Sequence, residues 1–241
     1  MPEQNKDALW YDEYYRKSSI DSAPWNEFLL PELTAALKPT HKLVELGCGQ
    51  GQVLRYVSET KLLPPKNICG IDQSAVAIDF VRSQIPGGDF RVGDLHELHL
   101  QPGSFNVCLL METIEHLTEP MPVLKEINTL LAPDGILYLS FPNFLHVPWL
   151  IIRILSKKLN KPNWVNLQPV DNIYTVFTVI KFLRDAGFEF EKAIGTMYCP
   201  PMPWRLLRHM EPPALTRALN TIGLWRLSFH PIMKFCKKNP S

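Results

Sequence analysis

The sequence predicts an α/β protein with a doubly wound, mostly parallel sheet and helical insertions over one edge of it. From Lys42 to Phe141, short apolar or β-branched runs alternate with segments of helical periodicity, the pattern of βαβ units. A glycine cluster, Gly47, Gly49 and Gly51, follows the first run. At that place in an open α/β sheet, a helix N-terminus offers unpaired N–H groups to a ligand. Both observations indicate a nucleotide-binding sheet.

Each expected strand is bounded by turn residues. The expected strands cover residues 42–46, 67–71, 90–92, 105–111, 136–141 and 188–194. Helices are expected directly after the glycines, after Ser74 as N-cap, and over 123–131 and 176–186. A closing strand is expected over 228–236 despite Pro231, which a sheet tolerates only at an edge or a bulge.

Composition excludes several classes of protein. The net charge of +1 shows no global field that would attract nucleic acid or an acidic partner. The five cysteines form no C-x-x-C pair, which argues against a zinc ribbon or a secreted disulfide framework. The N-terminus lacks the basic start and apolar run of a signal peptide, so a cytoplasmic location is expected. The apolar run 147–155 is interrupted by Arg153 and is too short for a transmembrane helix.

The spacing of the glycines distinguishes between two ligands. The cluster reads G-x-G-x-G, with Glu45 two residues before its first glycine. The dinucleotide fingerprint G-x-G-x-x-G would require glycine where this chain has Gln52. The spacing therefore argues against a nicotinamide-dependent oxidoreductase, which is kept as an alternative on the same scaffold.

Two further acids follow the second and third expected strands. Asp72 stands 21 positions after the third glycine, where a carboxylate can accept hydrogen bonds from both hydroxyls of a ribose. Asp94 can accept the amino group of adenine, and Leu95 can pack on the ring. Alone, Asp72 is also compatible with a surface turn, and Asp94 is uninformative. With the glycines, they indicate adenosine as the bound group.

Together these residues resemble the class I S-adenosylmethionine-dependent methyltransferases, over roughly residues 42–194. The first motif of that class is an acid followed by G-x-G-x-G, and its second strand ends in a ribose-binding acid. The resemblance implies that S-adenosylmethionine is the cofactor. It assigns the methionine part to Glu45, Gly47, Gly49 and Gly51, the ribose to Asp72 and Gln73, the adenine to Asp94 and Leu95, and the sulfonium side to Met111. Met111 is equally compatible with plain core packing.

Three later segments resemble one branch of this class in particular. Residues 110–117, 131–135 and 140–143 resemble, in order and spacing, the branch that contains ubiquinone-pathway O-methyltransferases. Asp134 stands where that branch usually has glycine, and Phe141 where it often has threonine. The branch implies O-methylation as the reaction.

His116 is the candidate general base, because it follows the fourth strand at the ligand-binding edge and imidazole titrates near neutral pH. A helix-start histidine bonded to backbone explains its position equally well. The spacing of Glu112, Glu115 and His116 also resembles a divalent-metal triad of some methyltransferases. This metal site is an alternative, and no metal ligand is predicted.

We expect a single methyltransferase domain. Residues 1–41 are expected to form an N-terminal helical lid, because Trp10, Tyr11, Tyr14 and Tyr15 recur at helical spacing and such a segment folds over the cofactor in the resembled class. The further expected parts are a cofactor-binding core over 42–195, insertions at 142–171 and 197–225, and a closing strand and tail over 226–241.

The expected function is direct methyl transfer to a small or lipid-linked acceptor. A non-catalytic nucleoside-binding adaptor is a second alternative, because fold does not guarantee activity. The insertions carry Trp, aliphatic and basic residues, among them Arg153, Lys157 and the run 204–208, which favour an apolar acceptor and a peripheral membrane contact. A nucleic-acid substrate is not expected, and no partner protein is implied.

Overall fold

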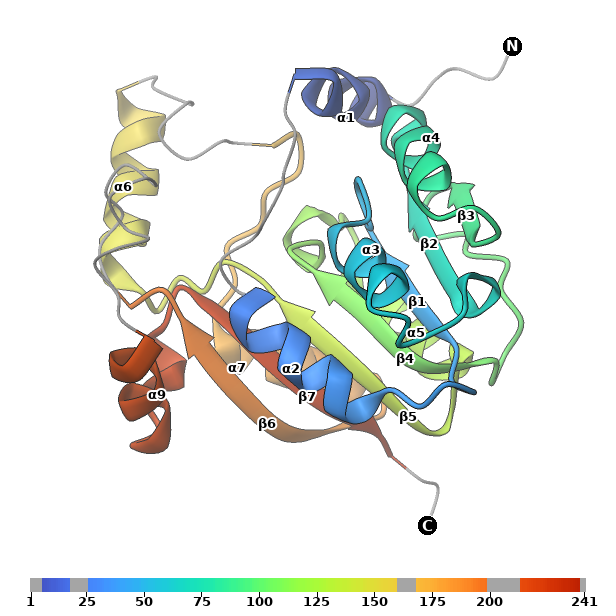
Figure 1. Cartoon of the computed structure of the whole chain (residues 1–241). Coiled ribbons are helices and arrows are strands. Elements are labelled where there is room, and N and C mark those ends of the chain that lie inside the picture. The colour runs from blue at the N-terminus through green and yellow to red at the C-terminus, as the bar shows by residue number, and fades with distance from the viewer. Residues whose placement is uncertain (1–5, 18–25, 160–167, 199–212, 239–241) are drawn as a thin grey trace.

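The computed structural model describes residues 6–17, 26–159, 168–198 and 213–238, and the description below concerns these residues. They contain a seven-stranded sheet with the strand order β3-β2-β1-β4-β5-β7-β6. The strands are β1 Leu43–Leu46, β2 Ile68–Asp72, β3 Asp89–Val92, β4 Phe105–Met111, β5 Leu131–Ser140, β6 Phe188–Thr196 and β7 His230–Lys237. Strands β1 to β5 are parallel, and β7 runs antiparallel between β5 and β6 (Figure 1).

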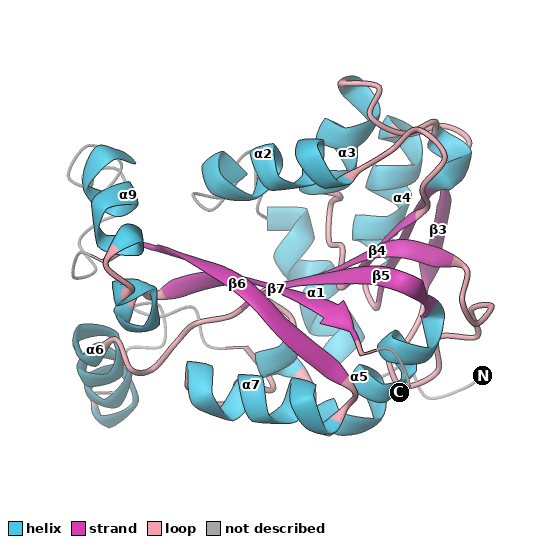
Figure 2. Cartoon of the chain, turned by 90° about the horizontal axis from the view of Figure 1, so that it is seen from below, coloured by secondary structure: helices cyan, strands magenta, loops and turns pink. Residues whose placement is uncertain are grey.

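Helices cover both faces of this sheet. The α-helices are α1 Lys6–Lys17, α2 Asn26–Ala36, α3 Gln52–Glu59, α4 Ala75–Gln84, α5 Pro120–Leu130, α6 Val147–Lys158, α7 Val176–Asp185 and α9 Pro213–Thr221. Short 3₁₀ turns are η1 Pro65–Asn67, η2 Ile114–His116 and η4 Leu224–Leu227. Figure 2 shows α2, α3 and α4 on one face and α5 and α7 on the other. The expected doubly wound fold is therefore confirmed.

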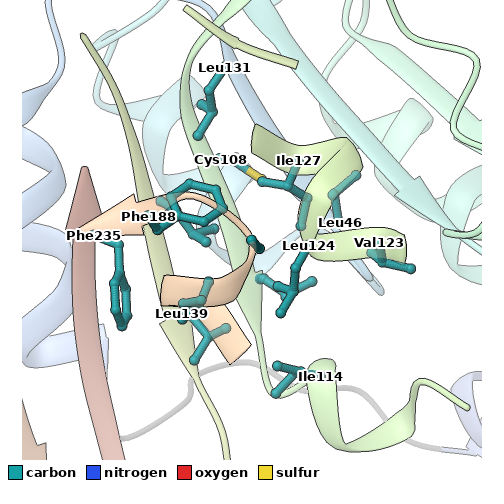
Figure 3. Close-up of a cluster of buried hydrophobic side chains, with 14 of the residues drawn as sticks. Leu46, Cys108, Ile114, Val123, Leu124, Ile127, Leu131, Leu139, Phe188 and Phe235 are labelled. Carbon is teal, nitrogen blue, oxygen red and sulfur yellow. The ribbon is translucent and has the colours of Figure 1, made fainter. Parts of the chain in front are cut away.

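The alternation of side chains along each strand supplies both faces with apolar contacts. In β4, Cys108 and Leu110 join the cluster under α5, while Val107, Leu109 and Met111 join the cluster on the opposite face. Figure 3 shows the first cluster, in which α5 residues meet side chains from the central strands. Burying each aliphatic side chain contributes about 1.5 to 3 kcal/mol, so both clusters stabilise the central strands that carry the ligand-binding edge.

The glycine cluster forms the expected turn between β1 and α3. Gly47, Gly49 and Gly51 all have positive φ angles, of 73°, 49° and 66°, which L side chains rarely adopt. At the next crossover, the Ser74 hydroxyl accepts a hydrogen bond from the Ala77 N–H at 3.2 Å and so caps α4, as predicted.

Two strands differ from the sequence-based expectation. The pairing of β4 with β5 jumps from Leu131 to Ile136, so β5 begins five residues earlier than expected and carries an irregular, partly exposed stretch before its regular part. Strand β7 is an internal strand, although Pro231 suggested an edge or a bulge. The proline is tolerated because it is the second residue of β7 and pairs only with Gly195 of β6; pairing with β5 starts at Ile232.

The two helices described within residues 1–41 pack in different places. Helix α1 lies beside α4 and contributes no fully buried residue (Figure 1). Helix α2 instead packs on the sheet, because Leu29 and Leu33 are completely buried in the same cluster as Leu43. The amphipathic pattern of α2 therefore serves the core, not the cover of a ligand.

The first insertion contains α6, and the second contains α9. Both lie at the end of the molecule that is opposite β3 in the two views (Figures 1 and 2). The expected position of Arg153 on an exposed surface is wrong: its side chain is 5% exposed and forms a buried ion pair with Asp171. Residues 204–208 lie outside the described part of the chain. Among the described residues, no helix is long and apolar enough to cross a membrane.

Replacing Gly51 or Gly103 with alanine should lower the stability of the protein by different amounts. Gly51 and Gly103 have nearly equal φ angles of 66° and 65°, but a Cβ at Gly51 would lie 2.3 Å from Val81 Cγ2, while a Cβ at Gly103 meets nothing within 4 Å. We expect Gly103→Ala to cost about 1 to 2 kcal/mol of unfolding free energy. Gly51→Ala should cost about 1 to 3 kcal/mol more, from the additional clash. Urea denaturation of both variants measures this, and equal costs would contradict the packing role.

Candidate active site

The carboxyl ends of β1, β2 and β4 open into a cavity with a volume of about 910 Å³. This volume lies near the upper end of the range for ligand pockets, ~300 to 1,000 Å³. Helix α1, the start of α6 and residues 168–171 supply the remaining walls. Open α/β sheets bind their ligands at this edge.

Glu45 lies in β1 with its side chain in the cavity wall and is 5% exposed. Burial, and then the negative charge of Asp72, raise its pKa to about 8. Among the described residues, its Oε2 atom has no hydrogen-bond partner. Burying a carboxylate oxygen without a hydrogen-bond partner destabilises the folded protein. A bound ammonium group would donate the missing hydrogen bond and so offset this cost.

The turn after β1 brings bare backbone to the same cavity. A Cβ at Gly47 would lie 2.5 Å from Thr113 Oγ1, and a Cβ at Gly49 would lie 2.5 Å from Tyr15 Oη. Both positions therefore require glycine for space as well as for φ. Gly51 differs, because it does not line the cavity and instead makes room for Val81 of α4.

Asp72 ends β2 and is 6% exposed. Its Oδ2 accepts a hydrogen bond from the Gly49 N–H at 2.8 Å, and its Oδ1 accepts one from the Ser74 N–H at 2.9 Å. Burial raises the pKa of Asp72, although these backbone hydrogen bonds act in the opposite direction. Each carboxylate oxygen keeps a second lone pair, so the group can still accept hydrogen bonds from a ligand in the cavity.

The cavity wall continues after β3. Asp94 Oδ1 accepts hydrogen bonds from the His96 N–H at 2.9 Å and lies 2.8 Å from His96 Nδ1. Burial acts to raise the pKa of Asp94, but the two hydrogen bonds from His96 lower it overall. Leu95 is 8% exposed beside this carboxylate and lines the cavity, as does Gln73 after β2.

His116 in η2 lines the far side of the cavity. Its Nδ1 lies 2.7 Å from the Val170 carbonyl oxygen. Because a carbonyl only accepts, Nδ1 carries the proton and Nε2 keeps its lone pair. Burial lowers the pKa of His116, although the Val170 contact acts in the opposite direction. The hydrogen bond to Val170 thus leaves Nε2 as the acceptor atom of the ring.

Glu115 and Glu112 lie beside His116. Glu115 Oε1 is 3.5 Å from His116 Nε2, and its Oε2 has no hydrogen-bond partner among the described residues. Burial, and then the charge of Glu112, raise the pKa of Glu115 well above its usual range. Glu112 Oε1 accepts a hydrogen bond from Ser140 Oγ at 2.6 Å, and its Oε2 lies 2.7 Å from His230 Nδ1.

The metal triad weighed from the sequence is not assembled. Glu112 faces His230 of β7 and Ser140 of β5, while His116 Nδ1 is bound to backbone. In the described part of the chain, no three His, Cys, Asp or Glu side chains are grouped closely enough to hold a metal ion.

Helix α1 closes the cavity next to the glycine turn. Tyr11 Oη donates a hydrogen bond of 2.5 Å to Gln168 Oε1. Asp12 Oδ1 accepts hydrogen bonds from Ser74 Oγ at 2.6 Å and from the Val76 N–H at 3.1 Å. The hydrogen bonds of Tyr11 and Asp12 thus hold a helix that has no fully buried residue of its own.

The structure brings the sequence-predicted residues to one cavity, with the exception of Gly51. Its lining includes Glu45, Gly47, Gly49, Asp72, Gln73, Asp94, Leu95, Met111 and His116. Sequence reasoning missed the contributions of Trp149, Phe229 and His230 to the same wall. Trp149 stacks on Phe229 at 4.4 Å between ring centroids, a contact across 80 residues that no local pattern signals.

Comparisons with known proteins agree with this geometry. Residues 44–139 match the family model described as a methyltransferase domain. A probable S-adenosylmethionine-dependent methyltransferase of Mycolicibacterium smegmatis is 30% identical over 65% of this chain and 55% of its own length. A ubiquinone biosynthesis O-methyltransferase of Xanthomonas euvesicatoria is 25% identical over 68% of each chain. This chain therefore spans only about half the length of the first of these relatives.

Solved structures share the fold. A putative methyltransferase of Haloferax volcanii, in complex with the Trm112 methyltransferase activator, superposes with a TM-score of 0.69 at 17% identity, over 98% of this chain and 99% of its own. A methyltransferase of Thermotoga maritima gives a TM-score of 0.62 at 20% identity, over 96% and 97%. Residues 44–139 of this chain therefore carry a methyltransferase domain, within the fold that these structures share. The name of the first relative gives S-adenosylmethionine as the cofactor of that protein.

The raised pKa of Glu45 predicts a pH dependence of stability in the ligand-free protein. The folded state holds the proton up to about pH 8, whereas an unfolded glutamate ionises near 4.5. The contribution of Glu45 to the free energy of unfolding is therefore full below pH 4.5. It is lost as the pH rises toward 8, by up to about 1.4 kcal/mol per pH unit. Glu45→Gln should remove this slope.

Urea denaturation between pH 5 and about 8 measures the slope. Glu97→Gln, which removes an exposed carboxylate, is the matched control. Parallel pH profiles for the wild type and Glu45→Gln would show that Glu45 is ionised in the folded state, contrary to this expectation.

Proposed function

We propose that this protein transfers the methyl group of S-adenosylmethionine to an oxygen atom of a small or lipid-linked acceptor. The observation that carries the proposal is the convergence, in one cavity, of the partnerless Glu45 oxygen, the Asp72 carboxylate and the unprotonated Nε2 of His116. The relatives with ubiquinone O-methyltransferase names support oxygen as the acceptor atom.

Within this proposal, each residue has a physical task toward the cofactor. Glu45 accepts the ammonium of the methionine part, and the open backbone of Gly47 and Gly49 admits its carboxylate. Asp72 and Gln73 bind the ribose. Asp94 and Leu95 bind the adenine, and Met111 at the end of β4 lies beside the sulfonium. The positive charge of the bound cofactor is matched by the acidic wall, which favours this ligand over an anionic dinucleotide.

At the acceptor end, the chain aligns the nucleophile and removes its proton. The cofactor supplies an activated methyl group, so alignment and exclusion of water are the main contributions of the protein. His116 Nε2 accepts the proton of the attacking hydroxyl, and the Val170 carbonyl holds the ring in the required tautomer. Phe144, Trp149 and Phe229 form an aromatic wall for an apolar acceptor. An acceptor linked to a lipid would also bring the protein into peripheral contact with a membrane.

Cofactor binding tests the ribose assignment. We expect Asp72→Ala to weaken S-adenosylmethionine binding by about 1.5 to 3 kcal/mol, the scale of losing hydrogen bonds to a charged group. Because Asp72 also holds the glycine turn, Asp72→Asn, which keeps one acceptor oxygen, should lose less. Isothermal calorimetry measures both, with surface Asp79→Asn as control. Unchanged affinity in a folded Asp72→Ala variant, or tight binding of NAD by the wild type, would contradict the proposal.

The base assignment predicts a kinetic signature. Turnover should rise with pH as His116 loses its proton, with a midpoint below its ordinary pKa of about 6.5, and stay level above it. His116→Ala should lower kcat at least about 100-fold while cofactor affinity is unchanged. A pH profile that persists in His116→Ala would assign the base elsewhere.

The assay uses labelled S-adenosylmethionine with an organic-phase lipid extract and, separately, an aqueous metabolite extract, followed by mass spectrometry of the methylated product. His41→Ala, at a partly exposed site remote from the cavity lining, is the control. Label on nitrogen or carbon would contradict O-methylation and leave the enzyme class in place. No label in either extract, despite cofactor binding, would favour a nucleoside-binding adaptor.

A further inference from the structure

One end of the molecule gathers exposed apolar side chains. In α6, the side chains of Val147, Ile151, Ile154 and Leu155 are between 40% and 58% exposed. Their spacing of three and four residues places them in one stripe along the helix. Helix α9, which lies at the same end in both views, and the neighbouring η4 add further exposed aliphatic residues: Leu215, Ile222, Leu224 and Leu227. Patches of this kind mark interaction sites on otherwise soluble folds.

Exposed basic side chains lie beside these apolar ones. Lys157 and Lys158 are exposed at the C-terminal end of the α6 stripe, and Arg217 and Arg226 are exposed on the α9 side. The sequence from Pro142 to Val170 contains no Asp or Glu, in a chain whose net charge is only +1. An apolar stripe with positive charges beside it complements an anionic lipid surface.

The opposite side of α6 forms part of the active-site wall. Trp149 and Arg153 line the cavity, and the buried ion pair of Arg153 with Asp171 fixes that side of the helix. The guanidinium also lies 5.2 Å from the centroid of the Phe144 ring. The helix already packs on the protein through this inner side. The core is therefore complete without the exposed stripe, which is left available to a partner outside the molecule.

We propose that the exposed face of α6, together with the α9 end, docks on an anionic phospholipid membrane and holds the acceptor end of the cavity next to the bilayer. This proposal rests on the proposed function, because docking at this face would let a lipid-linked acceptor reach His116 along the wall that α6 forms. The 12-residue α6 is about 18 Å long and suits a position in the interface plane, not across the bilayer.

Two other occupants fit the same face less well. A second copy would bring positive charge against positive charge. Single-stranded nucleic acid would use aromatic side chains for stacking, whereas the exposed side chains of α6 are aliphatic. Both remain outcomes of the experiment.

Vesicle flotation of the full chain tests the proposal, with phosphatidylcholine vesicles and with vesicles in which roughly a third of the lipid is phosphatidylglycerol. The wild type should float with the anionic vesicles at low salt and dissociate at high salt. Lys157→Glu with Lys158→Glu should weaken partitioning by about 30-fold or more, since each lysine near an anionic surface contributes about a factor of five. Ile151→Ser with Ile154→Ser should also weaken it.

Matched controls lie away from this end. Lys66→Glu with Lys125→Glu reverses two exposed charges elsewhere, and Val92→Ser replaces an exposed apolar side chain on β3. These variants should float like the wild type. Calorimetry with S-adenosylmethionine should give wild-type affinity for every variant, which excludes misfolding as the cause of a loss.

A wild type that stays in the soluble fraction with anionic vesicles at low salt would overturn the proposal. So would equal losses in the α6 and control variants. Dimerisation or oligonucleotide binding that is abolished by the α6 substitutions, without flotation, would assign the face to that other occupant. Failed flotation with intact methyl transfer would refute docking alone, and flotation without methyl transfer would refute only the proposed function.

Discussion

The carboxylate of Asp72 connects the parts of the structure that make up the site. It joins the end of β2 to the glycine turn after β1 through Gly49 and to the start of α4 through Ser74. The turn can approach only because its glycines take positive φ angles and carry no Cβ. One buried acid therefore fixes the backbone on one side of the cavity that it also lines.

Two buried glutamates, Glu45 and Glu115, lie in the wall of the cavity. Glu45 and Glu115 each keep one oxygen without a partner among the described residues, and burial raises the pKa of both. A fold stabilised only by internal contacts would satisfy these atoms. Within the proposed function, the cost at Glu45 is recovered when the ammonium group of the cofactor binds.

Helix α6 links the cavity to the outside of the molecule. Its inner side carries Trp149 and Arg153, and its outer side carries an aliphatic stripe that ends in lysines. The sequence shows the basic and apolar composition of this segment, and the aliphatic residues and Lys157 are exposed as expected. Arg153 was expected on the same surface, yet it is buried, and the carboxylate of Asp171, 18 residues later, compensates its burial.

The sequence by itself determined the alternating strands, the glycine turn and the acids at the strand ends, because each depends on short-range patterns of φ preference and hydrophobic period. It thereby indicated nine of the residues that line the cavity. Only the tertiary structure decided that β7 is an internal strand, that α2 belongs to the core, and that His230 faces Glu112. These features depend on contacts between segments that are distant in the sequence, such as β5 with β7 and Glu112 with His230, and no local pattern in the chain encodes such contacts.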